Sequence, residues 1–126
     1  MNWKDLEGKR FRMGIGEPWE ASEELAGREL VGVITDGGTT VNKYYGNREE
    51  CLVARLDESF EYDGIICQYF VISPRYQGSR MSRLLDGEQL TCGVIRVTEE
   101  HAKSEERLDT SWWRGGGAFI ATVRLL

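Results

Sequence analysis

Hydrophobic and polar residues alternate with a period of two along much of this chain, which is the pattern of β-strands with one buried face. Within residues 9–15, Phe11, Met13 and Ile15 lie on one face of the predicted strand, and Arg10 and Arg12 lie on the other. Residues 118–126 alternate in a similar way. The pattern predicts further strands over residues 28–35, 39–45, 51–56, 65–73 and 89–98.

Short turn motifs set the predicted connections between these strands. The run Asp36, Gly37 and Gly38 is typical of a hairpin turn, so residues 28–35 and 39–45 are predicted to be two strands. An acidic loop is predicted over residues 57–63. The 15 glycines against 2 prolines also indicate many tight turns.

The segment 65–73 differs from the other strands because it is apolar on both faces, with only Gln68 interrupting. We expect Ile66, Phe70 and Ile72 to share one face. A strand with two apolar faces is covered on both sides, so it is predicted to be central, or part of a closed sheet with a helix packed against it.

Capping signals predict three short helices. Ser79 is a candidate N-cap, with Gly87 just past the end of the helix that it begins. Thr98 is a candidate N-cap for a segment with two glutamates in its first turn. The predicted helices span residues 18–26, 79–86 and 98–108, the last being either a surface helix or a loop.

These elements predict one mainly β domain (a β-rich α+β domain) over residues 1–126. We expect a curved antiparallel sheet or closed barrel of about seven strands, with two or three short helices. Closing the sheet removes its exposed edges, whereas an open α+β sheet, the alternative, keeps them. The length of 126 residues is the usual size of a single domain.

The cellular location is predicted from the cysteines and the apolar stretches. Residues 1–7 carry charges where a signal peptide has an apolar run, and no apolar stretch is long enough to cross a bilayer. Cys51, Cys67 and Cys92 are odd in number and widely spaced, which favours reduced, buried thiols over disulfides or a zinc site. We therefore expect a cytoplasmic protein with no membrane contact, metal or cofactor.

No short catalytic motif is present: the chain lacks a nucleophile elbow, a phosphate-binding loop and a zinc-protease helix. The only histidine, His101, lies among glutamates and is expected to be a solvated residue on a helix face. The absence of catalytic motifs favours a binding protein over an enzyme. The net charge of −5 argues against nucleic acid as the partner.

A first candidate site is the arginine segment, residues 74–83, which carries three arginines and no acid. A helix that begins there offers free N–H groups which, with the arginines, suit a phosphate or carboxylate. The other interpretation is a connecting loop whose arginines pair with surface acids. The candidate anion contacts are Arg75, Tyr76, Ser79, Arg80 and Arg83.

A second candidate is the tryptophan segment, Trp112, Trp113 and Arg114, which precedes a run of glycines. Neighbours in an extended chain point to opposite sides, so we expect one of the two tryptophans to be exposed. An exposed tryptophan beside an arginine is typical of an interaction hot spot. The other interpretation is that one ring closes the end of the barrel while the second lies flat on the surface.

These candidates support two functional hypotheses. The first is a non-enzymatic binding protein that engages a protein partner or a second copy of itself through the tryptophan segment. The alternative is a binding protein or small enzyme for an anionic metabolite, with Arg75 or Arg80 as anion contacts. Its site is expected inside or at the mouth of the barrel, lined by Tyr44, Tyr69 and Phe70.

Overall fold

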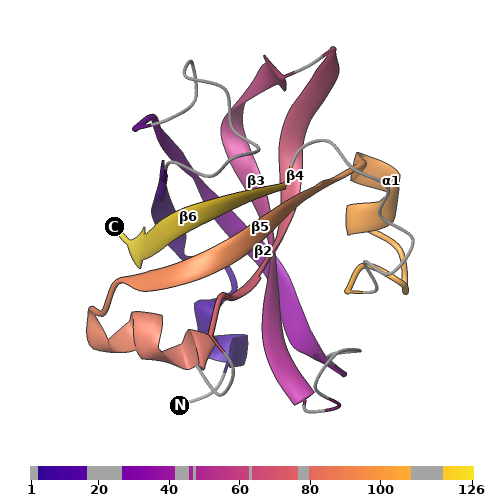
Figure 1. Ribbon diagram of the computed structural model, residues 1–126. Helices are drawn as coiled ribbons and strands as arrows, with labels where there is room; N and C mark the ends of the chain where they lie inside the picture. Colours follow the sequence, from indigo (N-terminus) through magenta and orange to yellow (C-terminus); the bar gives the residue numbers. More distant parts are fainter. Residues whose placement is uncertain are drawn as a thin grey trace.

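The predicted closed antiparallel barrel is confirmed, with six strands rather than about seven (Figure 1). The computed structural model describes residues 3–16, 27–41, 46, 48–62, 64–76, 80–108 and 118–126. Each strand pairs with the next along the chain, and the last strand pairs with the first. The strands are β1 (Arg10–Ile15), β2 (Glu29–Val41), β3 (Arg48–Tyr62), β4 (Ile65–Pro74), β5 (Leu90–Val97) and β6 (Ala118–Leu125).

The difference in strand number comes from β2, because the predicted hairpin turn at residues 36–38 is wrong. The chain passes through this point as one strand, with Gly37 opposite Leu52 of β3. The register shifts between Ile34 and Asp36, and the Asp36 carboxylate accepts a hydrogen bond of 2.8 Å from the N–H of Gly37. The aspartate–glycine sequence therefore forms a bulge instead of a reversal.

The acidic loop predicted over residues 57–63 is also wrong, because β3 continues through these acids to Tyr62. The register with β4 shifts between Arg55 and Phe60, so the strand absorbs the extra residues as an irregularity. Strand β3 and the far half of β2 remain paired up to Val41 and Arg48.

Three short helices lie within the described residues: η1 (Trp3–Leu6), η2 (Met81–Asp86) and α1 (Glu99–Ala102). Gly87 ends η2 with a φ of 81°, as predicted, but Arg80 stands at its N-cap. Thr98 caps α1 as predicted, accepting a hydrogen bond of 3.1 Å from the N–H of His101. The predicted helix 18–26 lies outside the described residues. None of the described helices is long and apolar enough to span a membrane.

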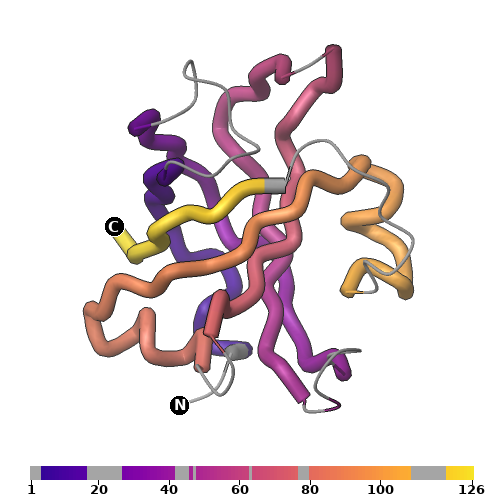
Figure 2. Tube along the Cα trace, viewed as in Figure 1, coloured from indigo at the N-terminus to yellow at the C-terminus, as the bar shows by residue number. Residues whose placement is uncertain are grey.

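The barrel interior is filled by one apolar cluster to which every strand contributes. Helices η1 and η2 lie side by side and close one end of the barrel (Figure 2). Leu6 of η1 and Met81 and Leu84 of η2 are buried in the cluster. The largest fully buried side chains include Phe11, Phe70, Met13, Ile34, Leu52, Leu56 and Ile72.

Strand β4 is apolar on both faces, as predicted, and both faces are covered at Phe70, Val71 and Ile72. Phe70 and Ile72 point into the barrel, while Val71 belongs to a second, outer cluster. The expectation that Ile66 shares the face of Phe70 is wrong, because Ile66 is 57% exposed. Cys67 and Phe70 are both buried in the interior cluster, so the regular alternation of faces is interrupted between them. The outer cluster consists of Cys51, Val53, Val71, Val97 and Ala102, with Tyr69 and Leu108 packed against it.

Candidate functional site

The outer cluster is covered by residues 98–108, which we call the strap. The strap contains α1 and the turns that follow it, and Figure 1 shows α1 outside the barrel wall. Leu108 at its end lies against Gly38 of β2, where an added Cβ would come within 2.6 Å of the leucine Cδ1. Glycine at position 38 therefore makes the room that the strap needs to dock.

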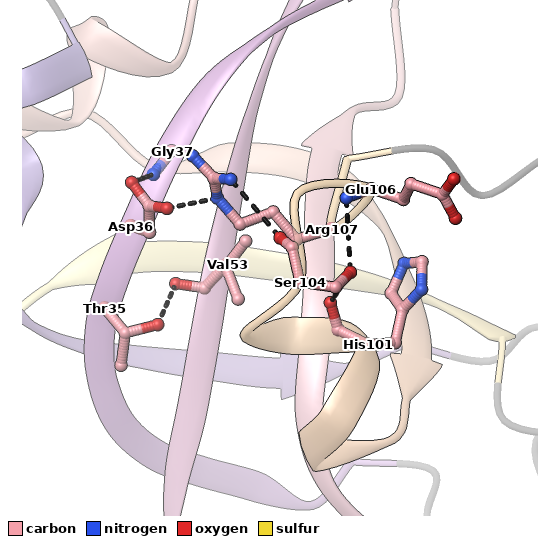
Figure 3. Close-up of polar contacts among 8 residues, drawn as sticks. All are labelled: Thr35, Asp36, Gly37, Val53, His101, Ser104, Glu106 and Arg107. Atoms are coloured by element: carbon pink, nitrogen blue, oxygen red, sulfur yellow. Dashed lines mark hydrogen bonds and ion pairs between the residues drawn. The ribbon is translucent and has the colours of Figure 1, made fainter.

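Polar contacts fix the end of the strap to the bulge of β2 (Figure 3). The guanidinium of Arg107 forms an ion pair with the carboxylate of Asp36. Arg107 also donates a hydrogen bond of 3.4 Å to the backbone oxygen of Ser104. The Ser104 hydroxyl in turn donates to the backbone oxygen of His101 at 2.9 Å. These bonds hold the turn after α1 in shape and attach it to the sheet.

A cleft of about 300 Å³ lies between the strap and the outer face of β2, β3 and β4. We call it the outer cleft. It combines an aromatic hydroxyl with three cationic side chains and one carboxylate, which gives a positive wall in a chain of net charge −5. The lining residues are Thr35, Asp36, Arg55, Tyr69, Ala102, Lys103 and Arg107.

Arg55 differs from the other cations of the cleft. Arg107 is paired with Asp36, and the Lys103 ammonium lies 2.7 Å from a Glu99 carboxylate oxygen. Within the part of the chain that the structure describes, the Arg55 side chain has neither a hydrogen bond nor an ion pair. A guanidinium carries five donors in a planar fork that matches a carboxylate or phosphate.

Glu99 of α1 lies beside the cleft and contacts two of its lining residues. Its Oε1 accepts hydrogen bonds from Lys103 Nζ at 2.7 Å and from the Tyr69 hydroxyl at 3.2 Å. The hydrogen bond and charge of Lys103 are the main cause that lowers the pKa of Glu99, and the bond from Tyr69 adds to it. The positive charge of Arg55 also lowers the pKa of this carboxyl.

A second hollow, of about 270 Å³, lies where β2 and β3 separate near Phe60. Arg28 and Asp57, two of its charged groups, already contact neighbours. The guanidinium of Arg28 lies over the Phe60 ring, 5.4 Å from the centroid. Asp57 accepts hydrogen bonds of 2.7 and 2.5 Å from Arg10. The outer cleft is the stronger candidate because one of its cations is unengaged.

Among the described residues, the buried titratable groups are His101 and the three cysteines. His101 is buried, with an exposed fraction of 9%, so the expectation of a solvated histidine is wrong. All three cysteines are free and buried, as predicted. Burial is the main cause that raises the pKa of Cys51 and of Cys92 to about 12, so both thiols stay protonated at neutral pH.

The arginine segment is described in part. Arg75 and Arg80 are exposed, and Tyr76 has an exposed fraction of 65%. Arg83 forms a two-pronged ion pair with Glu88, with hydrogen bonds of 2.8 and 2.6 Å. Ser79 lies outside the described residues. Arg83 is therefore paired with a surface acid, which agrees with the second interpretation of this segment.

The tryptophan segment, Trp112, Trp113 and Arg114, lies outside the described residues, as does Tyr44. In the chain it belongs to residues 109–117, which follow Leu108 of the strap directly. Tyr69 lines the outer cleft, whereas Phe70 is enclosed in the barrel core. Tyr69 and Phe70 therefore do not line one pocket, because neighbours in a strand point to opposite faces.

Sequence reasoning missed Arg55, Lys103 and Arg107 as site residues. They come from β3 and the strap, far apart in the sequence, and no motif joins them. The one signal that pointed to this side of the sheet was the doubly apolar strand 65–73, which predicted a covering helix.

Among the described residues no group of three or more histidine, cysteine, aspartate or glutamate side chains is placed to hold a metal ion. Comparisons of this chain with protein-family models, with curated proteins and with solved structures found no match. Function must therefore be inferred from the side chains and their geometry.

Proposed function

We propose that this protein is a non-enzymatic binding protein whose ligand is a small molecule with a carboxylate or phosphate group, held in the outer cleft. One observation carries the proposal: Arg55, unengaged among the described residues, lines a cleft of about 300 Å³ together with Lys103 and Arg107. Arginine binds such anions through two parallel hydrogen bonds. The volume is at the lower end of the range for small-molecule sites.

The chemistry of the cleft supports binding over catalysis. A general base at neutral pH needs a pKa close to the working pH. The two carboxylates at the cleft, Asp36 and Glu99, are both in ion pairs with cations. The pKa of Glu99 is lowered, so this carboxylate is a weak base.

Isothermal titration calorimetry with inorganic phosphate, pyrophosphate and citrate tests the proposal. We expect Arg55→Gln to weaken binding roughly 10- to 100-fold, the cost of losing charge-assisted hydrogen bonds. Arg75→Ala and Arg80→Ala are matched controls, because they remove an exposed arginine from the arginine segment and leave the cleft intact. Unchanged binding by Arg55→Gln, with loss of binding in either control, would place the anion at the arginine segment instead.

A second candidate function is self-association through Trp112, Trp113 and Arg114. The described residues offer few exposed large apolar side chains: Val41, Ile66, Tyr76 and Leu126. A hydrophobic hot spot is therefore better supplied by the tryptophans. Sedimentation velocity over a range of concentrations is the test, and we expect Trp113→Ala to abolish association while the circular dichroism spectrum is retained. A monomeric wild-type chain, or association unchanged in both Trp113→Ala and Trp112→Ala, rejects this function.

A further inference from the structure

The contacts of Glu99 identify the class of ligand more closely. Tyr69 and Lys103 line the outer cleft, yet both direct their donors to the same oxygen, Oε1 of Glu99. A carboxylate of the chain itself thus occupies the place where these two donors would hold an acidic group of a ligand. Arg55, which lines the same cleft, has no such internal partner among the described residues.

We infer that the ligand of the outer cleft carries two acidic groups, one bound by Arg55 and the other displacing the Glu99 carboxylate from Tyr69 and Lys103. This inference rests on the proposed function, since it concerns the same site. Glu99 then acts as an internal competitor. A ligand with a single acidic group binds to Arg55 alone and leaves Glu99 in place.

Electrostatics support this arrangement. The charge of Arg55 acts on both Glu99 and Lys103, so the three groups lie within one another's field. The ion pair between Lys103 and Glu99 is exposed, with 67% and 60% of the two side chains accessible. Exposed ion pairs contribute little net stability, so an incoming anion meets only a small cost in breaking this one.

Removal of the competitor is the direct test. We expect Glu99→Ala to tighten binding of pyrophosphate, which has two acidic groups, about tenfold, the effect of freeing one charge-assisted hydrogen bond. The control is Glu100→Ala, which removes the same charge from the neighbouring exposed residue of α1 and frees no cleft donor. Inorganic phosphate, with one acidic group, should gain no more affinity from Glu99→Ala than from Glu100→Ala.

The double variant Glu99→Ala/Lys103→Ala should lose most of the gain, because the freed ammonium is gone. Equal affinity of Glu99→Ala and Glu100→Ala for pyrophosphate would overturn the inference and leave the proposed function standing if Arg55→Gln still weakens binding. Absence of pyrophosphate binding by both the wild type and Glu99→Ala would overturn the inference, and absence of binding of phosphate and citrate as well would overturn the proposed function.

Discussion

The interior of the barrel and the region beneath the strap are built in different ways. The interior cluster is enclosed by the six strands and closed at one end by η1 and η2, and its large side chains come from every strand and from both 3₁₀ helices. The outer cluster has five buried members, and the strap is held over it by Ala102, Leu108 and a few polar contacts.

This difference separates the core of the fold from the proposed binding site. Elements with few buried apolar contacts open locally at a lower free energy than the core. The outer cleft lies on this less extensively packed side, where the proposed ligand would replace polar contacts and leave the barrel undisturbed. Two glycine substitutions test the comparison, and a third change measures a surface ion pair that belongs to neither region.

The largest effect is expected from Gly32→Ala in the wall of the barrel. A Cβ at this position would lie 2.9 Å from the Cα of Leu56 and closer still to the backbone oxygen of Arg55. Backbone cannot rotate away, so β2 and β3 must separate, and we expect the free energy of unfolding to fall by about 4 kcal/mol or more. Urea denaturation measures this loss.

The matched control for that change is Gly14→Ala in β1. No atom lies within 4 Å of a Cβ at position 14. Its effect should stay small, within roughly 1 kcal/mol. Similar losses for the two variants would show that the contact at Gly32 is unimportant.

A moderate and local effect is expected from Gly38→Ala. The new Cβ displaces the end of the Leu108 side chain, which can move, so the strap should loosen while the barrel persists. We expect a loss of roughly 1–2 kcal/mol, with faster hydrogen exchange in residues 98–108 and unchanged protection in β4 and β5. Gly93→Ala, whose Cβ would make an ordinary contact with Ser73 at 3.8 Å, is the control. Faster exchange throughout the barrel would contradict the separation of the two regions.

The smallest effect concerns the surface pair of Arg10 and Asp57. The hydrogen bond from Arg10 lowers the pKa of Asp57 below its ordinary value of 3.8. The pair therefore contributes stability that is fully present above the pKa of the unfolded chain and is lost as the pH falls through the lower pKa of the folded state.

Thermal unfolding of the wild type and of Arg10→Gln from pH 7 to pH 2 measures this contribution. The two melting temperatures should differ slightly at neutral pH and converge in acid. Added salt should shrink the difference, because both groups are exposed. A difference that stays constant with pH would show that the effect of Arg10 is not electrostatic.

Much of the fold was predictable because its signals are local. Alternation located β1, β4, β5 and β6 closely, and Thr98 identified the start of α1. The errors lie where one local sequence is compatible with two structures. Asp36 and the glycines after it suit a hairpin turn, but pairing with β3 favours a bulge that keeps the strand continuous.

The sequence by itself indicated a mainly β antiparallel fold, the burial of the thiols and the need for a cover over β4, whereas the pairing of β1 with β6 decided that the sheet is a closed barrel. Only the tertiary structure decided where the cleft lies and which cations line it. In the sequence, Arg55 has the pattern of an ordinary outward-facing strand residue. Lys103 and Arg107 are two of many charged residues in a polar segment. Alternation depends on neighbours along the chain, whereas the approach of β3 to the strap depends on register, bulges and the space left by Gly38. The outer cleft exists only after the strap has docked, so no stretch of sequence encodes it alone.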